Sequence, residues 1–485
     1  MSKVFYNCIN GQWVECKSKN TFSNVNPANT DEIVGLFQSS ASEDMRAACD
    51  AAQEAQLAWA ALPAPLRGEY LFKTADLLEG RLPHIAEEMT REEGKTLPEA
   101  KGELKRAINI FRYFGGEGAR RFGEQTPSER DSVFCYTMRK PLGVVGLITP
   151  WNFPAAIPTW KMAPALVAGN AVVIKPASLA PLTPLRLVEA LHEAGIPAGV
   201  VNFVTGGGDA VGDALIEHPA VKAVSFTGSC DVGHSVHEKA ARRRMRVQLE
   251  MGGKNPTIVL KDANLDFAVE TLVNGAFFST GQKCTACSRA IVERAVYEPL
   301  VEKLLARTKR LKVGNGLEAG VEIGPAVDER QLETDLHYVR VAKDEGAQLL
   351  CGGNRLSGGS YDKGYFIEPT IFAGVTPDMR IAQEEVFGPV LALMVASDFE
   401  DALRLANSVE FGLSASIVSN DLARVHEFIN GIEAGLITVN LPTAGVEYQL
   451  PFGGTKESSF GMREQGPAAL DFYTETRTVY LRYKQ

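Results

Sequence analysis

A cysteine and a glutamate in small-residue surroundings are the residues of this sequence best suited to covalent chemistry. Cys284 follows Gly281-Gln282-Lys283, and Glu250 lies upstream in Leu249-Glu250-Met251-Gly252-Gly253-Lys254. A thiolate attacks carbonyl carbons readily, and a nearby carboxylate can activate the water that releases an acyl group from sulfur. The pair therefore indicates covalent chemistry on an aldehyde.

Cys284 has two competing interpretations, as a packing residue and as half of a redox dithiol. Most cysteines are small buried hydrophobes, but Lys283 is expected to raise the local positive potential and Gly281 permits close approach of a ligand. Cys284 and Cys287 also form a CxxC pair, which in a thioredoxin-like domain follows the first strand of a much shorter chain. We therefore interpret Cys287 as a packing residue, or as a thiol that traps Cys284 under oxidation.

Two further polar residues suit the same reaction. Glu250, if partly desolvated between glycines, becomes a better base, whereas the alternative is an ordinary surface glutamate. Asn152 lies in Ile148-Thr149-Pro150-Trp151-Asn152-Phe153-Pro154, directly after a predicted strand, where ligands of open parallel sheets bind. Its amide N–H can stabilise an oxyanion in a loop held by prolines, and the alternative is a structural turn around a buried tryptophan.

Nucleotide-binding signals are scattered along the chain. No GxGxxG opens a first βα unit, and Gly206-Gly207-Gly208 is only an approximation that is often a plain loop. Phe226-Thr227-Gly228-Ser229 joins a predicted strand to a helix start, whose free N–H groups suit a pyrophosphate. Lys175 ends another strand and is placed to bind ribose hydroxyls. Glu385 and Phe387 combine a carboxylate with an aromatic face, which suits a ribose and a nicotinamide edge.

Alternating strands and helices must position these residues. Apolar runs predict strands, and amphipathic spacing with stop signals predicts the helices between them. The predicted strands are 144–148, 171–174, 200–204 and 221–226, and the predicted helices are 160–168 and 184–194. This rhythm predicts a parallel sheet with helices on both faces. A second α/β series is expected from residues 255–260 through a strand at 290–292 and a helix at 297–312.

Length and composition limit the remaining options. A chain of 485 residues exceeds one core and predicts two or three domains. A net charge of -9 disfavours a nucleic-acid partner, and the basic run at 242–246 is interpreted as a solvated helix end. Neither a signal peptide nor a membrane span is expected. Eight scattered cysteines fit reduced thiols in a cytoplasm, and the histidines lack the companions of a metal site.

In order and spacing, these residues resemble the motif series of the NAD(P)-dependent aldehyde dehydrogenase family, over essentially the whole chain. The series is Asn152, Lys175, Phe226 to Ser229, Glu250, Cys284, Glu385, Phe387 and Pro451-Phe452-Gly453-Gly454. The resemblance implies an α/β fold with a Rossmann-like NAD(P)-binding domain (1–122 and 142–252), an α/β catalytic domain (253–455) and a small β oligomerisation arm (123–141 and 456–485). It also implies a homodimer or homotetramer, and the two segments of strand composition at 132–137 and 474–481 are expected to pair within the arm.

The same resemblance implies a role for each residue. Cys284 is the nucleophile, Glu250 is the general base of deacylation, Asn152 forms the oxyanion hole with the Cys284 N–H, and Lys161 matches a lysine of the cofactor cleft. A glutamate at position 250 favours hydrolysis over acyl transfer to coenzyme A. The implied cofactor-binding residues are Thr149, Pro150, Trp151, Lys175, Ser178, Gly208, Phe226, Thr227, Gly228, Ser229, Glu385 and Phe387. A non-catalytic binding protein on this scaffold is disfavoured, because the catalytic residues are all present.

Two positions bear on cofactor and substrate choice. NAD-preferring relatives commonly carry a glutamate where this chain has Ser178, so we predict that NADP is accepted as well as NAD, either as the preferred cofactor or as a tolerated one. The segments 94–100, 162–166 and 444–447 resemble those of 2-oxoglutarate semialdehyde (2,5-dioxopentanoate) dehydrogenases. Phe278, however, replaces an arginine that often binds dicarboxylic semialdehydes. Either Arg289 or Arg112 binds the substrate carboxylate instead, or Phe153 and Phe278 line an apolar tunnel for aliphatic or aromatic aldehydes.

Overall fold

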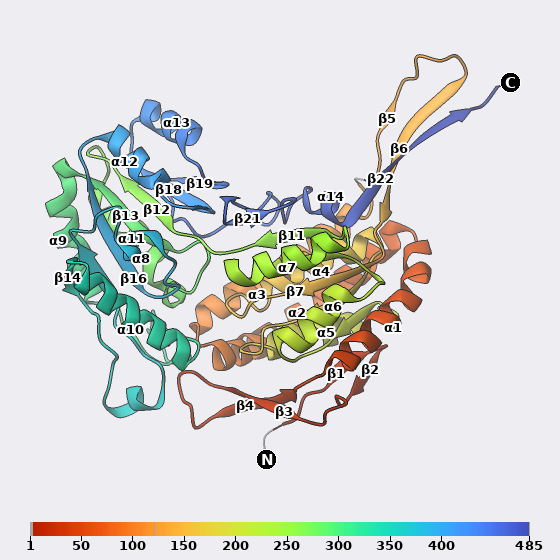
Figure 1. Cartoon of the computed structure of the whole chain (residues 1–485), viewed down its shortest axis with the longest axis horizontal. Helices are drawn as coiled ribbons and strands as arrows, with labels where there is room; N and C mark the ends of the chain where they lie inside the picture. The colour runs from red at the N-terminus through yellow and green to blue at the C-terminus, as the bar shows by residue number, and fades with distance from the viewer. Residues whose placement is uncertain (1–2, 121, 485) are drawn as a thin grey trace.

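The computed structural model describes residues 3–120 and 122–484. Over these residues the chain forms two α/β bodies, each built around its own sheet, and a β arm that projects away from them (Figure 1). No helix in these two stretches is long and apolar enough to cross a membrane. The α/β fold and the arm expected from the sequence are both confirmed.

An eight-stranded sheet organises the first body, in the order β2-β1-β9-β8-β7-β10-β11-β21. Its strands are β1 (Asn7–Ile9), β2 (Gln12–Val14), β7 (Val144–Ile148), β8 (Ala171–Lys175), β9 (Val201–Phe203), β10 (Val221–Thr227), β11 (Arg246–Glu250) and β21 (Ser459–Phe460). The central strands from β9 to β11 run parallel, which confirms the sheet predicted from the alternating pattern. A two-stranded ribbon of β3 (Thr21–Val25) and β4 (Ile33–Gln38) lies beside this body.

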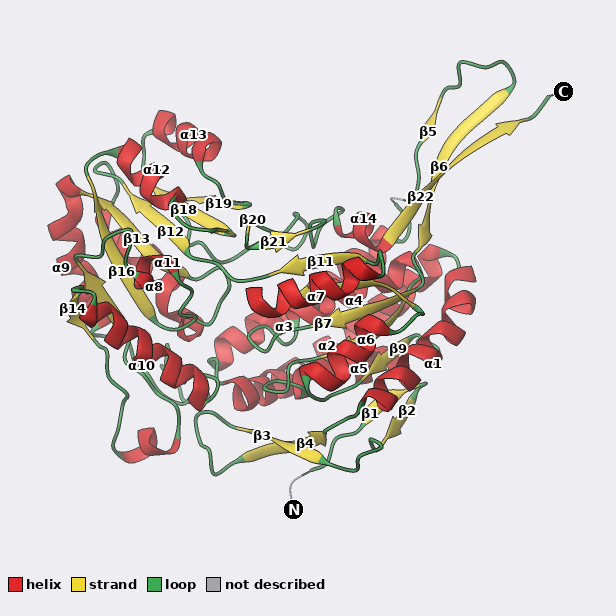
Figure 2. Cartoon of the chain, viewed as in Figure 1, coloured by secondary structure: helices red, strands yellow, loops and turns green. Residues whose placement is uncertain are grey.

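Alternate side chains of the central strands enter two different cores, as expected for a sheet covered on both faces. Val172 and Ile174 pack into one core, whereas Ala171 and Val173 pack into the other. The first core is covered by α2 (Ala64–Glu93), α3 (Leu97–Glu117), α4 (Ala156–Ala168) and α5 (Leu182–Glu193), and the second by α1 (Ser42–Ala61), α6 (Asp213–Glu217) and α7 (Cys230–Arg242). Figure 2 shows these helices around the sheet.

The strand order changes direction between β7 and β10. From β7 the chain proceeds to β8 and β9 on one side, and later returns to add β10 and β11 on the other. Ligands of parallel sheets bind in the crevice at such a point, at the carboxyl ends of the strands. The loop after β7 carries Asn152 and the turn after β10 carries Ser229, so the topology alone brings these two residues to one crevice.

A seven-stranded sheet organises the second body, in the order β14-β15-β16-β13-β12-β18-β19. Its strands are β12 (Asn255–Val259), β13 (Cys287–Glu293), β14 (Gln348–Cys351), β15 (Thr370–Ala373), β16 (Val390–Ala396), β18 (Ser414–Val418) and β19 (Leu436–Val439). Its helices are α8 (Leu265–Phe277), α9 (Tyr297–Thr308), α10 (Glu329–Asp344), α11 (Arg380–Gln383), α12 (Phe399–Asn407) and α13 (Leu422–Gly431). A short pair, β17 (Phe411–Gly412) and β20 (Thr455–Lys456), lies at its border.

The arm joins two segments that lie far apart in the sequence. Strand β6 (Val133–Pro141) pairs antiparallel with β22 (Thr474–Arg482), from Thr474 opposite Pro141 to Arg482 opposite Val133. This confirms the pairing expected between the two segments, and β5 (Gln125–Thr126) completes the sheet. Within residues 456–473, β21 adds to the first sheet and α14 (Ala469–Tyr473) contacts α4, so the paired strand of the arm begins at Thr474.

Candidate active site

Cys284 lies where two cavities meet. One cavity, of about 340 Å³, has walls from α3, the start of α4 and the 444–452 loop, and most of its lining is apolar. The other, of about 230 Å³, is the crevice at the carboxyl ends of β7 and β10. Cys284 lines both. A thiol in this position can react with a molecule that enters from one side while a second molecule occupies the other.

A strained turn delivers Cys284 to this position. Ser279, Thr280 and Gly281 have φ angles of 54°, 55° and 68°, in the left-handed region that side chains disfavour. A side chain on Gly281 would place its Cβ 2.2 Å from the carbonyl oxygen of Gly388, so only glycine fits there. Asn255 then fixes the cysteine, since its Nδ2 donates to the Cys284 carbonyl at 2.7 Å. Strain of this kind at a reactive residue is typical of functional sites.

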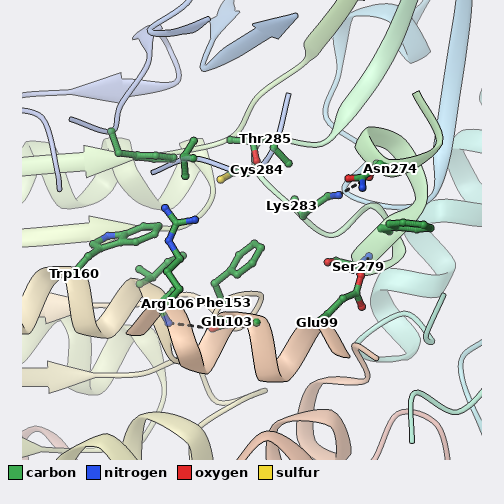
Figure 3. A pocket seen from close by; sticks show the side chains of 18 residues that line it. Glu99, Glu103, Arg106, Phe153, Trp160, Asn274, Ser279, Lys283, Cys284 and Thr285 are labelled. Carbon is green, nitrogen blue, oxygen red and sulfur yellow. Dashed lines mark hydrogen bonds between the residues drawn. The ribbon is translucent and has the colours of Figure 1, made fainter. Parts of the chain in front are cut away.

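The Cys284 thiol is held in its neutral form. Burial, together with the negative charges of Glu385 and Glu250, raises its pKa to about 12, although the N–H groups of Cys284 and Thr285 favour the thiolate. Lys283, expected from the sequence to raise the positive potential here, interacts with the Cys284 charge but does not prevent this rise in pKa. The Lys283 Nζ donates to the Asn274 carbonyl at 2.9 Å, so the charge is directed away from the sulfur (Figure 3).

Cys287, the second cysteine of the CxxC pair, belongs to a hydrophobic core. It is buried among the side chains of α8 and β13, and its thiol donates to the Arg289 carbonyl at 3.6 Å. It lines neither cavity of Cys284. This environment favours the packing interpretation of Cys287.

Asn152 points an amide into the crevice beside Cys284. Its Nδ2 donates one hydrogen to the Gln282 carbonyl at 3.0 Å, and an amide nitrogen carries a second hydrogen for an oxyanion. Its own backbone carbonyl accepts from Lys95 Nζ at 2.7 Å. Because Asn152 and Cys284 line the same crevice, the pair can form the oxyanion hole that the resemblance implies.

Glu250, the proposed base, is held slightly apart from the reaction centre. Its carboxylate accepts from Ser459 Oγ at 2.5 Å and from Gln248 Nε2 at 3.1 Å, and it lines neither cavity of Cys284. Burial, and then the negative charge of Glu464, raises its pKa well above the usual value for a glutamate. Glu250 therefore holds a proton more tightly than an exposed glutamate does, as expected of a base tuned by desolvation.

Lys161 lies beneath the site, not in the cofactor crevice. Its buried ammonium forms an ion pair with Glu464 and donates to Ser225 Oγ at 2.7 Å. Ser225 in turn donates to Gln248 at 2.7 Å, and Gln248 holds Glu250. The structure thus connects Lys161, expected from the resemblance to be a catalytic residue of the cofactor cleft, to Glu250 through a buried hydrogen-bond network, and Lys161 does not line the crevice.

The crevice wall contains most of the residues expected to bind a dinucleotide. The predicted residues that line it are Pro150, Trp151, Thr227, Gly228, Ser229, Glu385 and Phe387. Trp151 and Phe387 meet edge to face, with ring centroids 5.4 Å apart. Glu385 accepts from the Gly253 N–H at 2.8 Å, and burial raises its pKa to about 7. Ser229 is the N-cap of α7 and leaves the helix N–H groups without a side-chain partner, which suits a pyrophosphate.

Other expected cofactor residues lie behind or outside this wall. Thr149 and Phe226 are buried, and Phe226 packs in the core with Met251. Lys175 is buried at the end of β8, where Nζ contacts the Pro176 carbonyl at 3.3 Å, and Ser178 is exposed nearby. Gly208, also exposed, begins the turn of helix before α6.

Sequence reasoning missed three residues of the crevice wall. They are Met251, Gly252 and Gln331. Gly252 is a glycine for a physical reason, because a Cβ there would lie 2.3 Å from a Glu385 carboxylate oxygen. Within the described residues, no cluster of three histidines, cysteines or acidic residues is arranged to hold a metal.

The substrate residues expected from the sequence separate into two groups. Phe153 and Phe278 line the apolar cavity, as the tunnel hypothesis requires. The prediction that Arg289 binds the substrate carboxylate is wrong. Arg289 is fully buried and donates to the carbonyls of Lys254, Leu405 and Ala406 at 2.8–3.0 Å. It therefore stabilises the second body and is absent from the cavity wall.

The alternative prediction, that Arg112 binds the substrate carboxylate, is also wrong. It pairs on the surface of α3 with Asp76 and Glu79. The cavity instead contains Arg106, nearly two turns earlier on the same helix, which sequence reasoning missed. Its spacing from Glu99 and Glu103 was the available signal, since residues three, four and seven apart share a helix face.

The family model, the related sequences and the related structures that match this chain all belong to the aldehyde dehydrogenases. Residues 13–479 match the model described as the aldehyde dehydrogenase family. The chain is 52% identical over 479 residues to the alpha-ketoglutaric semialdehyde dehydrogenase of Bacillus subtilis, covering 99% of this chain and 98% of that protein. It is 48% identical to the alpha-ketoglutarate semialdehyde dehydrogenase of Haloferax volcanii, over 98% of this chain and 99% of that one. Betaine aldehyde dehydrogenase of Staphylococcus aureus, solved in complex with NAD+, superposes with a TM-score of 0.96 at 34% identity, covering 99% and 95% of the two chains.

Proposed function

The chain belongs to the aldehyde dehydrogenase family, and we propose that it oxidises 2,5-dioxopentanoate, the semialdehyde of 2-oxoglutarate, to 2-oxoglutarate with NAD(P)+ and water. The observation that carries the proposal is the position of Cys284 between a mostly apolar cavity and the crevice at the strand ends. The substrate is proposed from the two relatives named for this semialdehyde, at 52% and 48% identity over nearly the whole chain.

The first chemical step belongs to Cys284 and Asn152. The Cys284 thiol first gives its proton to water, and the thiolate then adds to the aldehyde carbon. The oxygen that becomes negative accepts from Asn152 Nδ2 and from the Cys284 backbone N–H. Asn152 is ready for this role because Gln282 and Lys95 fix its loop through hydrogen bonds of 3.0 and 2.7 Å. A nicotinamide held in the crevice beside Trp151, Glu385 and Phe387 would supply the acceptor for the hydride that leaves the substrate carbon.

The second step belongs to Glu250. After hydride transfer the acyl group is a thioester on Cys284, and Glu250 takes a proton from the water that hydrolyses it. In this structure Ser459 and Gln248 hold its carboxylate, so hydrolysis requires Glu250 to exchange the Ser459 bond for the water. The buried network through Gln248 and Ser225 to Lys161 and Glu464 fixes the position of the Glu250 carboxylate.

NADP is proposed as a cofactor alongside NAD, either as the preferred cofactor or as a tolerated one. The exposed Ser178 leaves no carboxylate at the position where NAD-preferring relatives commonly carry one, so a 2′-phosphate meets no like charge there. Lys175 lies three residues earlier at the end of β8. The ratio of kcat/KM for the two cofactors tests this, and a hundredfold preference for NAD would contradict it.

The arm is proposed to join subunits into a homodimer or homotetramer. Its strands present Phe134, Tyr480 and Leu481 at 38%, 66% and 46% exposure, which is apolar surface that a second subunit can cover. The domain boundaries inferred from the sequence remain part of the same proposal. A cytoplasmic location is proposed because eight free thiols suit a reducing compartment.

A steady-state panel of aldehydes tests the substrate. We expect the highest kcat/KM for 2,5-dioxopentanoate, above those for succinic semialdehyde, glyceraldehyde and benzaldehyde. The aromatic side chains of the cavity, among them Phe153, Trp160 and Phe278, favour a second candidate, a broad-specificity aliphatic or aromatic aldehyde dehydrogenase. Higher kcat/KM for benzaldehyde and simple aliphatic aldehydes would establish that candidate instead.

A further inference from the structure

Four charged side chains interrupt the mostly apolar lining of the cavity in front of Cys284. They are Glu99, Glu103, Arg106 and Lys283 (Figure 3). Charged groups in a largely apolar space need partners, because water does not fully solvate them there. The partners of each group therefore show which one is available to a ligand.

Both carboxylates are already engaged by the protein. Glu103 accepts from the N–H groups of Ala155 and Ala156 at 2.7 and 3.0 Å, and forms a 2.5 Å ion pair with Lys95. Glu99 accepts from the Ser279 N–H at 2.7 Å and from the N–H and hydroxyl of its helix cap. Glu103 therefore fixes the loop that contains Asn152, and Glu99 fixes the turn before Cys284, so both carboxylates have structural roles.

Lys283 is also engaged. Its Nζ donates to the Asn274 carbonyl at 2.9 Å, and burial lowers its pKa to about 8, so part of its charge is lost near neutral pH. In Figure 3 its side chain extends toward Asn274 and away from Cys284. Lys283 is therefore a poor anchor for an anion.

Arg106 differs from the other three. Its Nε is buried and has no hydrogen-bond partner, and its Nη2 donates a long hydrogen bond of 3.3 Å to the neutral amide oxygen of Gln465. No carboxylate lies within ion-pair distance of Arg106 among the described residues, and Glu103 and Glu447 act on it only at longer range. Figure 3 shows its guanidinium directed into the cavity between Trp160 and Phe153, toward Cys284.

An arginine in this state is poised for an anionic ligand. Burial disfavours its charge, yet a guanidinium stays protonated at any physiological pH, so the charge remains without a counterion. A carboxylate supplies two oxygens in the geometry that the guanidinium fork prefers, and charge-assisted bonds of this kind are among the stronger ones. An aldehyde bound at Cys284 with a carboxylate at its other end meets both requirements.

We propose that Arg106 binds the terminal carboxylate of the substrate and so selects aldehydes that carry a carboxylate at the end opposite the aldehyde. This inference rests on the proposed function and extends it, since it assigns the carboxylate of 2,5-dioxopentanoate to a residue outside the positions predicted from the sequence. The aromatic side chains around Arg106 then contact the carbon chain of the substrate, and the guanidinium holds its far end.

The test compares a charged and a neutral aldehyde of equal length in matched variants. For Arg106→Leu, the ratio of kcat/KM for 2,5-dioxopentanoate to that for pentanal is expected to fall about 100-fold, the loss typical of a charge-assisted pair. Arg106→Lys, which keeps the charge without the fork, should recover part of this ratio. The control is Arg112→Leu on the same helix, which lines no part of the cavity and should leave the ratio unchanged.

A measurement on the unaltered enzyme covers the case in which Arg106→Leu does not fold. Glutarate should inhibit pentanal oxidation competitively and more strongly than pentanamide does. Glutarate that binds no better than pentanamide, or an unchanged ratio in a folded Arg106→Leu, would overturn the role of Arg106.

Failure of the proposed substrate gives a different result. If the unaltered enzyme prefers another carboxylated semialdehyde and Arg106→Leu loses that preference, 2,5-dioxopentanoate is wrong as the substrate and the assignment of Arg106 is supported. If the unaltered enzyme prefers uncharged aldehydes over every carboxylated one, the proposed substrate and the assignment of Arg106 both fail.

Discussion

The buried ammonium of Lys95 donates a 2.7 Å hydrogen bond to the backbone carbonyl of Asn152, the residue whose side chain we propose as part of the oxyanion hole. Lys95 lies at the end of the turn between α2 and α3, and it also forms ion pairs with Glu93 and Glu103. A charged cluster inside the first body therefore sets the position of the oxyanion loop.

Replacing Lys95 with methionine should destabilise the protein and slow the reaction. The change leaves the Glu103 carboxylate buried without its cation, which typically costs about 3–5 kcal/mol. Urea unfolding and kcat measure the two effects. Lys105→Met is the control, because Lys105 pairs with Glu79 on the exposed face of α3 and its loss should cost less than about 1 kcal/mol. Equal losses in the two variants would contradict a special role for Lys95.

The two cysteines of the CxxC pair should separate in function. Cys284→Ser is expected to abolish aldehyde oxidation, because a serine hydroxyl in the same place has no base to activate it. Cys287→Ser should keep most of the activity and lose some stability, since Cys287 is buried in the core of the second body. Dehydrogenase assays of both variants measure this. The reverse pattern would revive a dithiol mechanism.

Glu250→Gln should stop the second step and spare the first. Without the carboxylate the thioester forms but water is not activated, so kcat should fall at least about 100-fold. A rapid burst of reduced cofactor, equal to the enzyme concentration, should remain in stopped-flow traces. A steady rate close to that of the unaltered enzyme would remove Glu250 from hydrolysis.

The reactivity of free Cys284 should rise steeply with pH. Because its pKa is raised to about 12, the thiolate fraction and the rate of alkylation should increase about tenfold per pH unit from pH 7 to 10 without a plateau. Iodoacetamide labelling of the cofactor-free enzyme, followed by peptide mapping, measures the rate at this residue. A plateau below pH 9 would mean that the thiol is activated before any ligand binds.

Gly281→Ala tests whether the turn before Cys284 requires glycine. The added methyl group would collide with the Gly388 carbonyl at 2.2 Å, and the resulting shift of Cys284 should lower kcat/KM about 100-fold. Gly320→Ala is a matched control, because Gly320 also has a positive φ, of 79°, but no atom within 4 Å of the added Cβ. The control should lose only about 1 kcal/mol of stability and no activity. Equal activity in both variants would refute the steric argument.

Much of the fold and of the reaction centre was predictable from local patterns. Strands such as Val144–Ile148 and the two arm segments have apolar or β-branched runs bounded by turn residues. A strand of this kind can be predicted from residues that are adjacent in the sequence. The order of Asn152, Glu250 and Cys284 along the chain was likewise sufficient for the family, which the comparison confirms. The long helices α1 to α3 were not predicted from the sequence.

The sequence by itself determined which residue types do the chemistry, and in which order these residues follow the predicted strands along the chain. Only the tertiary structure decided which charges face the substrate. Three arginines show this, although the sequence does not distinguish them. Arg289 donates to three backbone carbonyls, and Arg112 forms ion pairs on the surface. Arg106 enters the cavity with an Nε that has no hydrogen-bond partner. The reason is physical, since the free energy of a charge depends on its burial and its partners, and those come from segments distant in the sequence.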